Sequence, residues 1–191
     1  SDQRPAWLVM LPGPPRELRP MFADQVLPRL KGLCPLPVSC ACRTLRTVGI
    51  GESQVEQLIA EPLRGLIETG LELGYCARPG EVDVRLLARG TGAERMIAQA
   101  EECVRGLVGE HIFGQDDAEL ERVVVSLLRE RNRTLAVAES CTGGLIAHRV
   151  TNVPGASAVF LGGFIAYSNA AKLNLLGVQP ATLERHGAVS E

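Results

Sequence analysis

The chain has 191 residues, of which 46% are hydrophobic and 22% charged, and its formal net charge at pH 7 is −2. These values are typical of a globular protein of one or two domains, and they exclude nucleic-acid binding that depends on net charge alone. No apolar run approaches the ~18 residues that a bilayer span needs, and no signal-peptide pattern opens the chain. We therefore expect a cytoplasmic protein with no membrane contact.

Residues 1–35 are predicted to be the tail of a domain. The apolar stretch 6–11 predicts a buried strand, and a Pro-Gly-Pro-Pro turn ends it. Residues 16–30 predict a helix that stops at Gly32, because apolar side chains recur there near helical spacing. The chain begins with Ser1 and stops without a closing element, so we expect it to be part of a longer protein.

Residues 36–115 predict a compact α+β domain. The stretch 38–50 is rich in Val, Thr and Cys and predicts a long strand, after which Ser53 can cap a helix. The apolar side chains of that helix are Val55, Leu58, Ile59, Leu63 and Leu66. Strands at 71–77 and 82–86, a helix at 93–108 and a short strand at 111–113 complete the order β-α-β-β-α-β, the split βαβ arrangement.

The six cysteines show no metal-ligand pattern. They form no CxxC pair and have no histidine partners at ligand spacing, so we expect neither a metal site nor a disulfide framework. Cys40 and Cys42 share one face of the first predicted strand and are interpreted as core residues. Cysteines without a disulfide pattern indicate a protein of a reducing compartment.

Residues 116–191 predict an α/β unit that starts after a turn at 115–117. A strongly amphipathic helix around 120–128 precedes a buried strand at 134–138, a helix at 142–150, a strand at 161–167 and a helix at 169–176 that stops at Gly177. Such alternation predicts a layered sheet with helices on its faces. The fold class is therefore α+β followed by α/β.

Ser140 leaves the 134–138 strand and precedes a predicted helix. Reactive groups collect at the C-terminal ends of strands in α/β sheets, and amides at a helix start can hold a developing oxyanion. Gly143 and Gly144 allow a ligand or another backbone to come close. Taken alone, Ser140 is more readily interpreted as a helix N-cap with no chemistry.

The second strand also ends in polar residues, Tyr167, Ser168 and Asn169, with Lys172 about one turn later. If the two strands are neighbours, the lysine amine can reach Ser140. None of the histidines has an aspartate partner at a suggestive spacing, and a lysine removed from water can serve as a base, so a Ser–Lys or Ser–Tyr–Lys site fits the available residues. The alternative is that Lys172 is a solvated helix residue.

These segments closely resemble the C-terminal domain of the CinA (competence/damage-inducible) family and its stand-alone PncC members, which are nicotinamide-nucleotide amidases. The matching residues are AESCTGG, GGFIAYSNAAK, LLGV and HGAVSE. The resemblance implies the first part of a three-layer α/β/α domain, since the later family segment GIAGPxGG is absent. It implies hydrolysis of nicotinamide mononucleotide to nicotinate mononucleotide and ammonia, in NAD salvage in bacteria.

The resemblance also implies roles for individual residues. Ser140 would be the nucleophile, and Tyr167 and Lys172 would move its proton. Substrate contacts would come from a further set: Glu139, Thr142, Gly143, Gly144, Ser168 and Asn169. It implies a small-molecule nucleotide substrate, no cofactor, no metal, no nucleic acid and a homo-oligomer.

The remaining segments resemble the same family. LPGPPREL resembles a segment near the end of its molybdopterin-binding-like domain, where Arg16 and a helix start suit a phosphate contact. Residues 36–115 resemble its KH-like linker, but we identify neither a GxxG in a predicted loop nor a basic face there, so we interpret them as a spacer or assembly element. The alternative to an amidase is a non-catalytic protein that binds nicotinamide mononucleotide or ADP-ribose.

Overall fold

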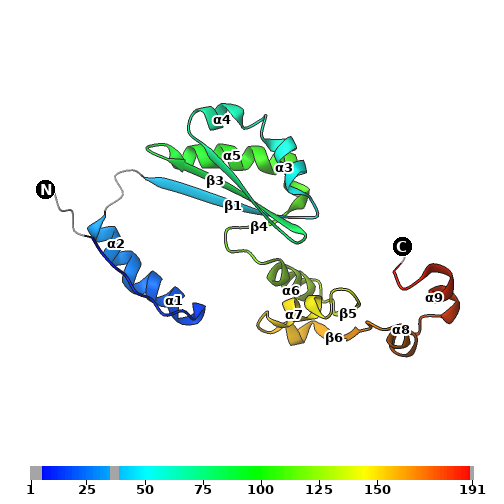
Figure 1. Ribbon diagram of the computed structural model, residues 1–191. Coiled ribbons are helices and arrows are strands. Elements are labelled where there is room, and N and C mark those ends of the chain that lie inside the picture. The colour runs from blue at the N-terminus through cyan, green and yellow to red at the C-terminus, as the bar shows by residue number, and fades with distance from the viewer. Residues whose placement is uncertain (1–5, 35–38, 190–191) are drawn as a thin grey trace.

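The computed structural model describes residues 6–34 and 39–189. Its N-terminal part is one continuous helical segment, as predicted for residues 16–30 (Figure 1). It consists of α1 (Pro15–Met21), a π-helical stretch η1 (Phe22–Val26) and α2 (Leu27–Leu33). Pro20 and Pro28 cannot donate backbone hydrogen bonds, which interrupts a regular α-helical ladder across this segment.

The strand predicted at residues 6–11 is not formed. These residues adopt neither helix nor strand, and the side chains of Leu8 and Met10 are 86% and 84% exposed. A strand needs a neighbour for its backbone hydrogen bonds, and the sheets of the described residues contain no partner for this segment. The interpretation as a buried strand is therefore wrong for this structure.

The middle domain has the predicted order of elements. They are β1 (Cys40–Val48), α3 (Glu52–Ile59), α4 (Arg64–Glu68), β2 (Glu72–Arg78), β3 (Glu81–Arg89), α5 (Ala93–Val108), the 3-10 turn η2 (Gly109–His111) and β4 (Ile112–Gln115). The strands form an antiparallel sheet in the order β2-β3-β1-β4. Each helical crossover joins two strands that have a third between them, which is the split βαβ topology.

One face of this sheet packs on the helices, as Figure 1 shows. Leu45 on β1 and Val84 and Leu86 on β3 are fully buried there with residues of α3 and α5. Cys40 and Cys42 lie on the opposite side and are exposed, so their interpretation as core residues is wrong. The alternation of a strand assigns both cysteines to one face, but it does not say which face the helices cover.

The first crossover helix also differs from its prediction. It begins at Glu52 after Gly51, and Ser53 does not cap it. The predicted single helix breaks into α3 and α4, with Pro62 in the connection. Proline lacks the amide hydrogen that a continuous helix requires. Leu58, one of the apolar residues predicted for this helix, is 40% exposed.

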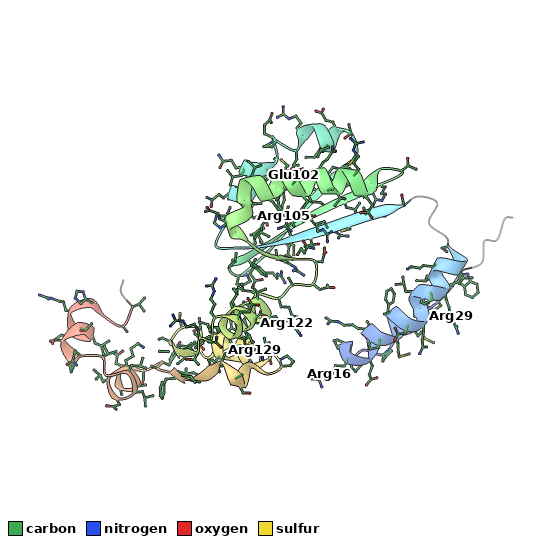
Figure 2. All side chains as sticks on the ribbon, turned by 180° about the vertical axis from the view of Figure 1, so that it is seen from behind. Arg16, Arg29, Glu102, Arg105, Arg122 and Arg129 are labelled. Carbon is green, nitrogen blue, oxygen red and sulfur yellow. The ribbon has the colours of Figure 1, made fainter. Side chains whose placement is uncertain are left out.

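The C-terminal unit alternates helices and strands as predicted up to α8, and a further helix, α9, follows that was not predicted. Its elements are α6 (Leu120–Glu130), β5 (Leu135–Glu139), α7 (Leu145–Thr151), η3 (Ala156–Ala158), β6 (Phe160–Ile165), α8 (Asn169–Leu176) and α9 (Pro180–His186). β5 and β6 pair in parallel, and their small core contains Val125, Val150 and Val159. Arg122 and Arg129 project from α6 in Figure 2, and Arg129 donates to the Pro154 carbonyl at 3.2 Å.

The joint between the two units is hydrogen-bonded. Asp116 has a positive φ of 52°, and its Oδ1 accepts a hydrogen bond from the Thr44 amide at 3.1 Å. Arg43 pairs with the same carboxylate, and Arg46 Nε donates to the Asp116 carbonyl at 2.7 Å. These contacts attach the connection to β1. Across the described residues, none of the helices combines the length and the apolar content needed to traverse a bilayer.

Candidate active site

The ends of β5 and β6 lie side by side. The two strands run parallel, with Ala138 opposite Phe164 and Glu139 opposite Ile165. Ser140 follows the first strand, and Ala166 and Tyr167 follow the second. The predicted pairing of these two strands is thus confirmed, and it brings both polar segments to one edge of the sheet.

Lys172 reaches that edge from α8. The helix begins at Asn169, and the Ser168 hydroxyl caps it by accepting a hydrogen bond from the Ala171 amide at 3.1 Å. Lys172 lies one turn in, and its side chain is buried, with the residue 9% exposed. The interpretation of Lys172 as a solvated helix residue is therefore wrong.

The Lys172 amine has three oxygen partners. Nζ lies 3.1 Å from Ser140 Oγ, 2.9 Å from the Ala166 carbonyl and 3.2 Å from the Tyr167 carbonyl. All three partners are neutral groups. An ammonium can donate to each of them, whereas a neutral amine can donate to the two carbonyls and accept from the serine hydroxyl. The same geometry therefore serves both protonation states.

Ser140 is not the cap of the following helix. α7 begins only at Leu145, after a turn in which Gly143 and Gly144 have φ values of 60° and 96°. Both values lie in the left-handed region that favours glycine. Because Ser140 does not cap α7, its half-buried hydroxyl is left to contact Lys172.

The carboxylate of Glu139 occupies the start of α7 instead. Oε2 accepts hydrogen bonds from the amides of Gly144 and Ile146, each at 3.0 Å, and Oε1 accepts one from Ala147 at 2.9 Å. Burial acts to raise the pKa of Glu139, but the hydrogen bonds from Ala147, the Thr142 side chain, Ile146 and Gly144 outweigh it and lower that pKa. The Ile146 and Ala147 amides at the start of α7 therefore donate to an internal carboxylate, which leaves the predicted oxyanion role to other amides near Ser140.

The remaining residues of the predicted site have different positions and contacts in the structure. Tyr167 is 72% exposed, and its contact with Lys172 is made by the backbone carbonyl. The Thr142 side chain contributes to the lowered pKa of Glu139, Ser168 caps α8, and Asn169 is the exposed first residue of that helix.

Two features of the site were missed from the sequence, and one of them has no signature in side-chain chemistry. The Ala166 carbonyl is the nearest partner of Lys172, and a backbone oxygen cannot be singled out from residue types. The capping role of Glu139 had one signal, a carboxylate shortly before two glycines and a helix. Among the residues that the structure describes, no cluster of three or more His, Cys, Asp or Glu is arranged to hold a metal ion.

Two family models match the chain. The model of the KH domain of damage-inducible protein CinA matches residues 42–114, and the model of the CinA C-terminal domain matches residues 117–191. Together the two matches cover the middle domain and the C-terminal unit, including the strand ends, Ser140 and Lys172.

Relatives are similar over nearly the whole chain. A protein of Moorella thermoacetica, designated competence-damage inducible by its name, is 48% identical over 184 residues, which are 95% of this chain and 44% of the relative. A CinA-like protein of Akkermansia muciniphila is 46% identical over 183 residues, 96% of this chain and 42% of the relative. The competence/damage inducible protein CihA from Agrobacterium tumefaciens, a crystal structure, is 45% identical over 37% of this chain and 43% of that chain, with a TM-score of 0.37. The chain spans less than half the length of these curated relatives.

Proposed function

Because this chain belongs to the CinA family, we propose that the protein containing it is a nicotinamide-nucleotide amidase. It would hydrolyse nicotinamide mononucleotide to nicotinate mononucleotide and ammonia. The observation that carries the proposal is the 3.1 Å contact between Lys172 Nζ and Ser140 Oγ. A serine within hydrogen-bond reach of a base is the arrangement of an activated nucleophile.

The first half of the reaction forms an acyl-enzyme. Neutral Lys172 takes the proton of Ser140 as Oγ attacks the carboxamide carbon, which gives a tetrahedral oxyanion. The intermediate then collapses, the C–N bond breaks, and the proton on Nζ passes to the departing nitrogen. Ammonia leaves, and the nicotinoyl group remains as an ester on Ser140.

Water completes the reaction. It attacks the ester carbon, gives a proton to Lys172, and breaks the bond to Oγ, which recovers its proton from Nζ. The product is nicotinate mononucleotide, and one water has been consumed for each ammonia released. The two carbonyls of Ala166 and Tyr167 support this cycle, because they keep Nζ pointed at Ser140 in both protonation states.

The roles of the remaining predicted residues belong to the same proposal. The exposed phenol of Tyr167 is available to a bound substrate and would assist protonation of the leaving ammonia. Gly143, Gly144 and Asn169 lie beside Ser140 or at the start of α8, and they would contact the nucleotide.

Substitution at either member of the pair tests the proposal. In the protein at its natural length, Ser140→Ala and Lys172→Ala should each lower kcat for ammonia release from nicotinamide mononucleotide by about a thousandfold or more, as for residues that act as one catalytic unit. The matched control is Lys31→Ala, since Lys31 is the other lysine of the chain and is exposed on α2. Its turnover should equal that of the wild type.

Calorimetry combined with the ammonia assay separates an amidase from a nucleotide-binding protein without turnover. Calorimetric titration that shows tight binding of nicotinamide mononucleotide or ADP-ribose, with no ammonia from the wild type, would favour the non-catalytic alternative. Normal turnover in Ser140→Ala or Lys172→Ala would contradict the assignment of the nucleophile and base.

A further inference from the structure

Glu139 precedes the proposed nucleophile, and we propose that its carboxylate positions Ser140 and does not bind the substrate. The inference rests on the proposed amidase function, because it states how that site holds its serine. It replaces the substrate contact that the family resemblance implied for this residue.

The carboxylate is mostly committed to internal donors. Its two oxygens accept hydrogen bonds from the amides of Gly144, Ile146 and Ala147, and the Thr142 side chain also lowers its pKa. An ionised carboxylate offers about four lone-pair sites, so the three amides occupy most of them. Glu139 is also only 4% exposed, so it offers almost no surface to a substrate as large as a nucleotide.

Glu139 joins three parts of the site. Its backbone belongs to β5 opposite Ile165, and its side chain holds the start of α7. The turn that begins with Ser140 is therefore anchored at both ends by Glu139. The backbone of Glu139 belongs to the strand before the turn, and its side chain binds the helix after the turn. A short loop closed in this way loses most of its conformational freedom.

A second set of contacts ties this loop to the lysine. The Glu139 carbonyl accepts a hydrogen bond from the Ala166 amide at 2.8 Å. The Ala166 carbonyl in turn accepts one from Lys172 Nζ at 2.9 Å, and Nζ contacts Ser140 Oγ at 3.1 Å. Glu139 thus sets the distance between the serine and its base without touching either reacting atom.

A positioning residue that does not contact substrate affects kcat and leaves KM nearly unchanged. In the protein at its natural length, Glu139→Gln replaces one acceptor oxygen by an NH2 group that faces an amide donor. We expect kcat for nicotinamide mononucleotide to fall by about ten- to a hundredfold, as for a small misplacement of a reacting group, with KM within about twofold of the wild type. Glu94→Gln is the matched control, since Glu94 is an exposed acid in the first turn of α5.

Two readouts do not depend on the amidase. Amide hydrogen exchange at Gly144, Ile146 and Ala147 should be faster in Glu139→Gln than in the wild type or the control. Labelling of the Ser140 hydroxyl by a fluorophosphonate should be slower. If the wild type releases no ammonia but both changes occur, the proposed function fails and the positioning role stands.

Other results overturn the inference. Unchanged exchange and labelling in Glu139→Gln would do so whatever the activity, and so would a tenfold or larger rise in KM with kcat preserved, which would make Glu139 a substrate ligand. If Glu139→Gln does not fold, as judged by circular dichroism, Thr142→Val removes the hydroxyl that helps to lower the pKa of the same carboxylate. It should change exchange and labelling in the same direction by a smaller amount, and no change there would equally overturn the inference.

Discussion

Two ionisable residues are buried at the ends of β5 and β6, and each is accommodated by hydrogen bonds. Three backbone amides donate to Glu139, while three oxygen atoms surround the Lys172 amine. A buried polar group that lacks such partners is costly. The partners of Glu139 fix its carboxylate in place. The partners of Lys172 include Ser140 Oγ, an atom that can exchange a proton with the lysine amine.

The lowered pKa of Glu139 predicts a dependence of stability on pH. The native state favours the ionised carboxylate, so the unfolded chain takes up this proton more readily. The stabilisation is therefore fully present above the unfolded value of about 4.3 and is lost as pH falls through the lower native pKa.

Thermal unfolding between pH 7 and pH 3 measures this contribution. Wild type should have the higher Tm at pH 7, and its advantage over Glu139→Gln should shrink as pH falls. Glu94→Gln, an exposed control on α5, should stay close to the wild type at every pH. A Tm difference between Glu139→Gln and wild type that is constant down to pH 3 would contradict the assigned direction.

The element scale concerns how closely β6 approaches β5 and α7. A Cβ built on Gly163 would lie 2.6 Å from Val137 Cγ2 and 3.2 Å from the Val137 carbonyl oxygen. The two strands thus have room for a hydrogen atom at this position but none for a methyl group. Their spacing sets where Ser140 and Ala166 emerge, because both residues follow directly from the strand ends.

Gly163→Ala should therefore destabilise the protein by about 1–3 kcal/mol, the usual cost of overpacking. Gly106→Ala provides a control of opposite sign: Gly106 lies inside α5 with nothing within 4 Å of its added Cβ, and alanine there should stabilise by about 0.5–1 kcal/mol. Urea unfolding measures both. Equal effects of the two substitutions would show that Val137 does not limit the strand spacing.

At the scale of the whole molecule, Arg149 connects the middle domain with the C-terminal unit. It extends from α7 to Glu81 on β3 at 2.6 Å and to Glu121 on α6 at 2.8 Å. The hydrogen bonds to Glu121 and Glu81 raise the pKa of Arg149. Glu81 is 8% exposed, and the pair lines a cleft of about 670 Å³ between the two units. The middle domain therefore holds the helix whose start Glu139 caps.

A double-mutant cycle tests this connection. Glu81→Gln and Arg149→Met should be non-additive in urea unfolding, with a coupling of about 1–3 kcal/mol, because the pair is partly removed from water. The exposed pair Glu72–Arg89 within the middle domain is the control and should couple by less than about 1 kcal/mol. Additive effects of Glu81→Gln and Arg149→Met would mean that this contact does not join the two units.

Local patterns were sufficient for most of the order of the elements between residues 38 and 176. The helix at 93–108 and the stop at Gly177 were predicted with the bounds that the structure has, since burial periodicity and glycine caps act within a few residues. The strand at 6–11 and the single helix after Ser53 were not formed. The first lacks a pairing strand among the described residues, and Pro62 lies where the second breaks.

The sequence by itself determined which reactive groups follow the two strands, because strand ends, glycines and a rare lysine are visible in a linear string. Only the tertiary structure decided what each group contacts. It turned Glu139 inward to α7, aimed Lys172 at Ser140, left the Tyr167 ring outside, and put Cys40 and Cys42 on the uncovered face of their sheet. The physical reason is that periodicity records whether a residue is buried, whereas its partner depends on elements packed against it from elsewhere in the chain.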